Sequence, residues 1–179
     1  MIVWLDLETT GLDAEKDLIL EVACVVTTDQ LAELGRFHAV TDYAKRVPLC
    51  SLPVRVQEMH LENGLWLDSL RNGQSADSVA SAFHNFLVGE MKIPKDPKPL
   101  LAGNTISFDR RFLQEKWPLT ASLFHYRDYN VTTLHEFFKG AAPDVYTAAP
   151  GRCPGHRAMP DILSSLENTR YYAQKVKSL

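Results

Sequence analysis

The first forty residues of the chain alternate between apolar segments and short polar loops. The segment from Met1 to Leu5 is entirely apolar and predicts a buried strand. A short polar stretch then leads to the turn residue Gly11. Two further segments, Leu18–Thr27 and Leu31–Val40, predict a second and a third strand. Because only short loops join the three strands, we expect them to form an antiparallel meander.

The spacing of apolar positions changes to a helical period between residues 54 and 88. Val54–Glu62 is expected to be a helix that stops at Gly64. Ser75 is a good N-cap for a second helix reaching Val88. The apolar face of that helix consists of Val79, Phe83, Phe86 and Leu87. The segment Lys92–Pro99 is interpreted as a surface connector, because too little chain follows it to build another domain.

The second half of the chain alternates between strand and helix patterns. We expect a strand over 99–102, a helix over 108–117, a strand over 124–131, a helix ending at 139, an irregular segment over 141–155 and a last helix. Ser107 and either Thr132 or Thr133 are the expected caps of the first two of these helices, and Pro160 is the expected first residue of the last one. Its apolar face would consist of Ile162, Leu166, Ala173 and Val176. A meander followed by this alternation predicts an α/β fold with a mixed sheet.

Length and charge restrict the kinds of function that are expected. A chain of 179 residues favours a single domain spanning 1–179, with a core large enough to be stable without disulfide bonds. The formal net charge is −3, whereas proteins that grip long nucleic acids by the backbone usually have a basic surplus. A nucleic-acid ligand would therefore be short, or metal ions would supply the positive charge.

The three cysteines favour an intracellular protein. Cys24, Cys50 and Cys153 are odd in number and form no C-x-x-C pair, which favours reduced thiols. A zinc site built on Cys153 and His156 would lack a second pair of ligands at a useful spacing. No apolar run reaches the ~18 residues of a membrane span. A strand that begins at residue 2 also leaves no room for a signal peptide.

Four acidic residues are candidates for a metal site. Asp6 and Glu8 lie two residues apart on a predicted strand and should project from the same face. Two such carboxylates repel each other unless a cation neutralises them, and oxygen ligands of this kind suit Mg²⁺ or Mn²⁺. Asp109 and Asp161 fall in first helical turns. The alternatives are a solvated acidic turn for the first pair and simple dipole-complementing acids for the second. Glu21 either reaches the cluster or lies at a sheet edge.

One histidine has a local context that suggests chemistry. His156 lies five residues before Asp161 and follows Gly155, so it is expected in the loop before the last helix. From that loop its imidazole can reach a site that Asp161 anchors. The alternative is an ordinary surface histidine.

Together these residues resemble the DEDDh exonuclease superfamily, which has a ribonuclease H-like fold. Within that superfamily the chain is most similar to the oligoribonuclease family. Four segments carry the resemblance: residues 6–12, 103–113, 124–127 and 156–161. Their order and spacing span nearly the whole chain. The fold implied is a mixed five-stranded sheet with an antiparallel three-strand meander, flanked by helices.

The resemblance implies a 3′→5′ exoribonuclease that degrades very short RNA, down to dinucleotides, to nucleoside 5′-monophosphates. It implies two divalent metal ions, Mg²⁺ or Mn²⁺, held by Asp6, Glu8, Asp109 and Asp161. His156 matches the general base. It also implies a homodimer. Relatives act in the bacterial cytoplasm or in mitochondria, and the cytoplasm is the compartment we expect first.

The resemblance also suggests substrate-binding residues. Leu12 should wedge against a base and Thr105 should contact the substrate, while Tyr126 and Arg127 should reach the substrate of a partner subunit. The chain departs from the family pattern at four positions, none of them a metal ligand. These are Thr9 in place of Met, Arg55 in place of an aromatic residue, Phe108 in place of Gln and Asn130 in place of Asp.

Two other functions use the same residues. A DEDDh DNA exonuclease of the proofreading or trimming type would share the acidic residues and the histidine. A non-catalytic RNA-binding protein with this fold is the second alternative, although an intact set of four acids and a histidine favours an enzyme. A purely structural α/β protein would have to carry all five residues by chance.

Overall fold

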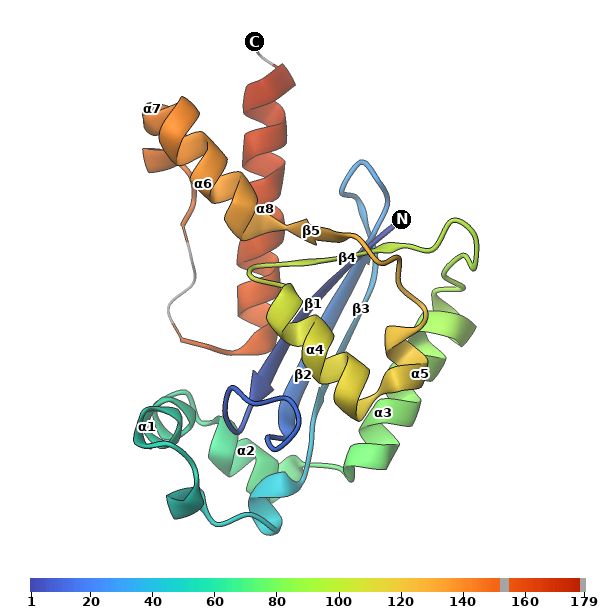
Figure 1. Ribbon diagram of the computed structural model, residues 1–179, viewed down its shortest axis with the longest axis vertical. Helices are drawn as coiled ribbons and strands as arrows, with labels where there is room; N and C mark the ends of the chain where they lie inside the picture. The colour runs from blue at the N-terminus through green and yellow to red at the C-terminus, as the bar shows by residue number, and fades with distance from the viewer. Residues whose placement is uncertain (152–154, 178–179) are drawn as a thin grey trace.

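The fold is built on one five-stranded sheet. The structure is a computed structural model that describes residues 1–151 and 155–177 (Figure 1). The strands lie in the order β3-β2-β1-β4-β5. Adjacent pairs are antiparallel from β3 to β1 and parallel from β1 to β5. The bounds are Ile2–Thr9 for β1, Ile19–Thr27 for β2, Glu33–Val40 for β3, Leu100–Gly103 for β4 and Asp128–Asn130 for β5. The predicted mixed sheet with its three-strand meander is confirmed.

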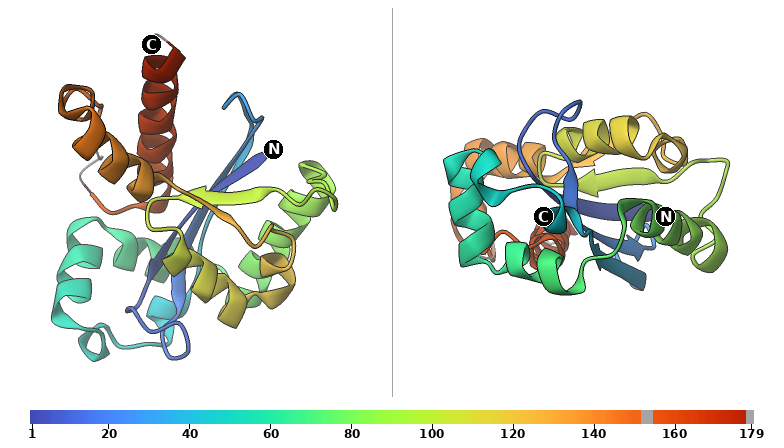
Figure 2. Two further views of the ribbon diagram at one scale, coloured as in Figure 1. Left: turned by 45° about the horizontal axis from the view of Figure 1, so that its top comes forward. Right: turned by 90° about the horizontal axis from the view of Figure 1, so that it is seen from below.

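Helices pack against this sheet and connect its strands (Figures 1 and 2). The α-helices are α1 Val54–Glu62, α2 Leu65–Asn72, α3 Ala76–Asn85, α4 Ser107–Lys116, α5 Pro118–Ala121, α6 Val131–Ala141, α7 Pro143–Thr147 and α8 Ala158–Lys177. Three single turns complete the described elements: η1 Tyr43–Lys45, η2 Leu49–Ser51 and the π-turn η3 Phe86–Glu90. Among the described residues, no helix combines the length and apolar character needed to cross a membrane.

The alternation of side chains along β1 divides the core into two layers. Val3, Leu5 and Leu7 pack with α3 and α4 on one side of the sheet. Ile2 and Trp4 pack with α6 and α8 on the other side. Side chains of even number in β1 therefore point toward α8. Trp4 is fully buried there, and its indole N–H donates to Thr27 Oγ1 at 3.0 Å.

Three predicted connections contain helices that the sequence pattern did not reveal. Helix α2 follows the predicted stop at Gly64, while α5 and α7 begin at Pro118 and Pro143. Pro118 directly follows the helix predicted over 108–117, and Pro143 lies in the segment expected to be irregular. Each proline occupies a first helical position, where its missing N–H is not needed. The strand expected over 124–131 is shorter, since only Asp128–Asn130 pairs with β4.

The structure confirms one predicted helix cap and corrects several other predicted helix ends. The Ser75 cap is confirmed, because Ser75 Oγ accepts a hydrogen bond from the N–H of Ser78. Helix α4 instead has Ile106 at its N-cap, and α6 is capped by the side chain of Asn130. The last helix, α8, begins two residues before Pro160, at Ala158, which is buried against the sheet. Val176, expected on its apolar face, is 56% exposed.

Candidate active site

Strand β1 and helix α8 bring three of the predicted acids together. Asp6 and Glu8 are on the even-numbered face of β1, and Asp161 lies in the first turn of α8. One carboxylate oxygen from each of the three can be chosen such that all lie within 4.8 Å of one another. This spacing suits a shared divalent cation, because carboxylates are the hard oxygen ligands that Mg²⁺ and Mn²⁺ prefer.

Asp109 reaches the same place from the opposite side of β1. The pairing of β1 with β4 ends at Trp4 and Ala102, so the backbone of β1 beyond this point has no β4 partner. Asp109 Oδ1 accepts a hydrogen bond at 2.9 Å from the N–H of Leu7, which lies between Asp6 and Glu8. The Asp109 side chain is thereby anchored beside the other acids.

The acids strongly perturb one another. Burial raises the pKa of Asp6 well above its ordinary value, and the charges of Asp109, Glu8 and Asp161 raise it further. Burial, followed by the charges of Glu21 and Asp161, raises the pKa of Glu8 to about 9. Burial likewise raises the pKa of Asp109 to about 8, although the Leu7 hydrogen bond opposes it. A cluster that retains protons near neutrality is one that a divalent cation would stabilise in its ionised form.

A cavity of about 520 Å³ opens directly over these acids. Its lining consists of Asp6, Leu7, Glu8, Leu12, Asn104, Thr105, Ser107, Phe108, Asp109, Arg111, His156 and Asp161. The structure therefore brings all five predicted catalytic residues to one cavity. Leu12 and Thr105, two of the four predicted substrate contacts, line the same cavity.

His156 is held in an exposed loop at the cavity edge. Its backbone has a φ of +46°, in the left-handed region that non-glycine residues rarely adopt. The carbonyl of His156 accepts a hydrogen bond from the side chain of Asn63 in the turn between α1 and α2. The imidazole also borders a second cavity of about 490 Å³, lined by Arg55, Glu58, Met59, Glu62, Asn63 and Gly155. Arg55, one of the departures from the family pattern, therefore lies beside the histidine.

The two predicted substrate-binding residues in the cavity differ in exposure and in how they are held. Leu12 is 79% exposed at the cavity rim, which is an unusual place for a leucine in a soluble domain. Thr105 has a φ of +50°, and its N–H donates to Asn130 Oδ1 and Thr132 Oγ1. Asn130, another departure from the pattern, thus holds the loop that carries Thr105.

Tyr126 and Arg127 do not line this cavity. Tyr126 is 75% exposed, and the Arg127 guanidinium lies 5.2 Å above its ring centre. Arg110 holds the preceding loop by donating to the carbonyl of His125 and to Asp128. Their assignment to a partner's substrate therefore stays a prediction.

Sequence reasoning assigned no site role to three polar residues that line the cavity. Asn104 follows β4 directly, and its amide donates to Ser165 of α8 at 2.8 Å. Ser107 and Arg111 are one helical turn apart on the cavity side of α4. The four-residue spacing between them, next to Asp109, was a signal that could have identified them.

Glu21 neither joins the metal group nor lies exposed at an edge. It is 1% exposed and pairs directly with Glu8 across β1 and β2. Burial alone would raise the pKa of Glu21, but hydrogen bonds from His38 and Arg157 lower it below its ordinary value. Glu21 is thus buried with charged partners, and its ion pair with Arg157 was not foreseen from the sequence.

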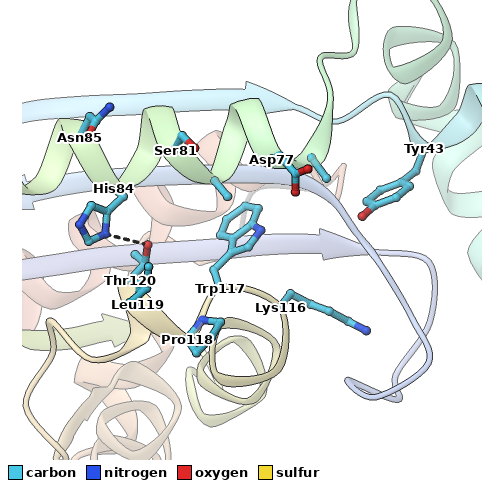
Figure 3. A pocket seen from close by; sticks show the side chains of 12 residues that line it. Tyr43, Asp77, Ser81, His84, Asn85, Lys116, Trp117, Pro118, Leu119 and Thr120 are labelled. Carbon is cyan, nitrogen blue, oxygen red and sulfur yellow. Dashed lines mark hydrogen bonds between the residues drawn. The ribbon is translucent and has the colours of Figure 1, made fainter.

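A cavity of about 650 Å³ lies away from the acids, between α3 and α5 (Figure 3). The side chain of Trp117 points into it, and His84 Nδ1 lies 3.2 Å from Thr120 Oγ1. Of the acids described above, none lines this cavity within the described part of the chain. We assign it no function.

Cys153, the cysteine of the zinc hypothesis, lies outside the described residues.

Comparison with known protein families agrees with the sheet order and the site geometry. An exonuclease family model, RNase_T, matches residues 3–169. The chain therefore belongs to the exonuclease family, and it is a nuclease of the hydrolase class.

Curated relatives narrow this assignment to the oligoribonucleases. The chain is 34% identical to an oligoribonuclease of Tropheryma whipplei over 97% of its own length and 91% of that protein. It is 33% identical to an oligoribonuclease of Shewanella baltica over 98% and 94% of the two lengths. Within the exonuclease family, the chain groups with the oligoribonucleases.

Solved structures support the fold. An E. coli exonuclease I in complex with single-stranded DNA and zinc superposes with a TM-score of 0.73 at 14% identity. Exonuclease I of Methylocaldum szegediense gives a TM-score of 0.71 at 17% identity. In both comparisons 97% of the chain is matched, but it spans only 40% of the exonuclease I chain. The shared architecture is the ribonuclease H-like fold.

Proposed function

We propose that residues 1–179 form a single domain that acts as a metal-dependent 3′→5′ exoribonuclease on very short RNA. The observation that supports this most is the convergence of Asp6, Glu8, Asp109, Asp161 and His156 on one cavity. Four carboxylates can offset the four positive charges of two divalent ions, Mg²⁺ or Mn²⁺. Similarity to the oligoribonucleases supports RNA as the substrate.

The chain's own residues would perform distinct steps. Asp6, Glu8, Asp109 and Asp161 would together hold the metal ions. When bound, two such ions supply an activated water and stabilise charge on the phosphate. His156 would accept the proton of that water at an imidazole nitrogen, since histidine is the side chain that most often serves as a general base near neutrality. The water oxygen would form a bond to phosphorus as the bond between phosphorus and the 3′-oxygen breaks. The 3′-oxygen would take a proton from solvent and leave as a hydroxyl, and a nucleoside 5′-monophosphate would be released.

A short substrate agrees with the charge and with the site. A dinucleotide has one internal phosphate, so the net charge of −3 does not oppose binding as it would for a long nucleic acid. Leu12 at the cavity rim would stack against a base, and Thr105 would contact the backbone. In a homodimer, Tyr126 and Arg127 of the partner subunit would close the other end of the substrate.

The test is hydrolysis of a diribonucleotide in Mg²⁺ or Mn²⁺, with and without EDTA. We expect turnover in metal, loss of turnover in EDTA, and loss in Asp109→Ala. Competing substrates would be a longer RNA and single-stranded DNA. A preference for long DNA would favour the alternative DNA exonuclease, and absence of hydrolysis in either metal would favour a non-catalytic RNA-binding protein.

A further inference from the structure

The residue after His156 makes contacts that the proposed chemistry does not use. Arg157 donates from Nε and Nη2 to Glu21 on β2 at 2.8 to 3.1 Å. Its Nη2 also donates to Asp68 on α2 at 2.9 Å. A planar guanidinium that bridges two carboxylates fixes both the position and the direction of its backbone attachment.

The same acid holds the start of α8. The N–H of Ala158, the first residue of α8, donates to Glu21 Oε2 at 3.1 Å. The N–H of Asp161 in turn donates to the carbonyl of Arg157 at 3.1 Å. Because Glu21 lies in the sheet and is 1% exposed, these contacts tie the first turn of α8 to a rigid element.

A third set of contacts holds the carbonyl of the histidine itself. The side chain of Asn63 donates to the carbonyl of His156, and the carbonyl of Asn63 accepts from Arg157 Nη1 at 3.5 Å. The turn between α1 and α2 thus contacts the loop at two consecutive residues, His156 and Arg157. A non-glycine residue persists with a left-handed φ only where its surroundings hold it there, which is the case for His156.

We propose that Arg157, clamped between Glu21 and Asp68, is a positioning residue that sets the placement of the His156 imidazole and of the Asp161 carboxylate together. This inference rests on the proposed function. Arg157 touches neither substrate nor metal in this proposal. It acts through the backbone on either side of it, so its loss would slow the reaction without weakening substrate binding.

The burial of Glu21 decides which substitutions can test the contacts of Arg157 with Glu21 and Asp68, which we call the clamp. Arg157→Ala would leave Glu21 buried, charged and opposite Glu8, so the variant could lose stability for that reason alone. Arg157→Lys keeps the positive charge but loses the planar fork. Asp68→Asn leaves the Glu21 contact intact and changes a residue that is 28% exposed at its side chain.

The experiment compares kcat and KM for diribonucleotide hydrolysis in Arg157→Ala, Arg157→Lys and Asp68→Asn. By analogy with losses of residues that orient metal ligands, we expect kcat to fall roughly 10- to 100-fold in Arg157→Ala. In Arg157→Ala, KM should stay near the wild-type value, and added guanidinium ion should restore part of the lost kcat. Arg157→Lys should retain only part of the wild-type kcat. Arg36→Ala is the matched control, because Arg36 makes a bidentate pair with Glu33 at an exposed site of β3.

Two results would overturn the proposal. One is a kcat for Arg157→Ala equal to that of the Arg36→Ala control. The other is a rate loss that follows the fraction of unfolded protein in a thermal melt and shows no rescue by guanidinium.

Amide hydrogen exchange separates this inference from the proposed function. The amides of Ala158 and Asp161 should exchange faster in Arg157→Ala than in wild type, whether or not the protein cleaves RNA. An inactive wild-type protein would refute the proposed function, and faster exchange would still show the clamp. Unchanged exchange at both amides would refute the clamp.

Discussion

At the scale of single residues, the cluster of acids is built at the expense of stability. Glu8 is 7% exposed and Asp109 is 3% exposed, and burial is the largest cause of the raised pKa of both. A carboxyl whose pKa is higher in the folded state than in the unfolded state stabilises the fold only while it is protonated. As the pH rises toward the folded pKa, this stability is lost.

Glu8→Gln should therefore stabilise the metal-free protein at high pH. The pKa of Glu8 is about 9. In EDTA, the unfolding free energy of the variant should therefore exceed that of the wild type by an amount that grows as pH rises from about 4.5 to 9 and is small below that range. A gain of ~1 kcal/mol would raise the Tm of a chain of this size by about 2–4 °C. Thermal melts at pH 4.5 and pH 9 provide the measurement. An equal shift at both pH values would contradict the prediction.

His156→Ala should separate catalysis from metal binding. Loss of a general base typically costs about 10²- to 10⁴-fold in rate, whereas His156 is not one of the proposed metal ligands. We expect kcat to fall in that range while Mn²⁺ affinity, measured by calorimetry, stays close to wild type. A near-normal rate would show that the proton goes elsewhere.

At the scale of elements, the site exists because β1 and β4 separate after three paired positions. Gly103 ends β4 where a Cβ atom would lie 2.7 Å from the carbonyl oxygen of Leu5 and 3.1 Å from Ile106 Cδ1. This close packing lets the chain turn at once into α4, which carries Asp109 to the Leu7 N–H. A glycine at this position is required by space rather than by backbone angles.

Gly103→Ala should destabilise the fold. Because the nearest obstacle is backbone rather than a flexible side chain, the methyl group forces β1 and β4 apart, and overpacking of this kind typically costs about 1–3 kcal/mol. Urea denaturation measures the change. Gly89→Ala is the control, since a Cβ atom there would meet nothing within 4 Å. Equal stability of the two variants would exclude this role for Gly103.

At the scale of the whole molecule, one proposed group of substrate contacts is separated from the cavity. Leu12 and Thr105 line it, whereas Tyr126 and Arg127 lie on an exposed loop outside its lining. In the proposed homodimer, the second copy of the chain would bring that loop to a substrate. The proposed dimer and the proposed substrate grip are therefore one hypothesis.

Mixed dimers test that hypothesis. Asp109→Ala and Arg127→Ala are each expected to hydrolyse diribonucleotides poorly. If Arg127 acts on the partner's substrate, a heterodimer of the two contains one intact site. Mixing the variants should therefore give a rate above the sum of their separate rates, and sedimentation should show a dimer. A rate equal to that sum would place Arg127 in its own subunit's chemistry.

The sequence by itself determined the three-strand meander and the mixed sheet, and its resemblance to the DEDDh exonucleases indicated the five residues around the cavity. The strand features depend on local periodicity, as in the alternation that places Asp6 and Glu8 on one face of β1. Local pattern was less reliable for short helices. Pro118 and Pro143 start helices that were expected to be loops, because a proline ends one helix and begins another with equal ease.

Only the tertiary structure decided which distant residues share one environment. Glu21 and Arg157 are 136 positions apart, and no local pattern indicates that they form a buried ion pair. The raised pKa values of Asp6, Glu8 and Asp109 likewise depend on burial between β1, α4 and α8. Burial and long-range pairing are properties of the packed chain, so the electrostatics of the site and the clamp beside His156 follow from packing rather than from local sequence.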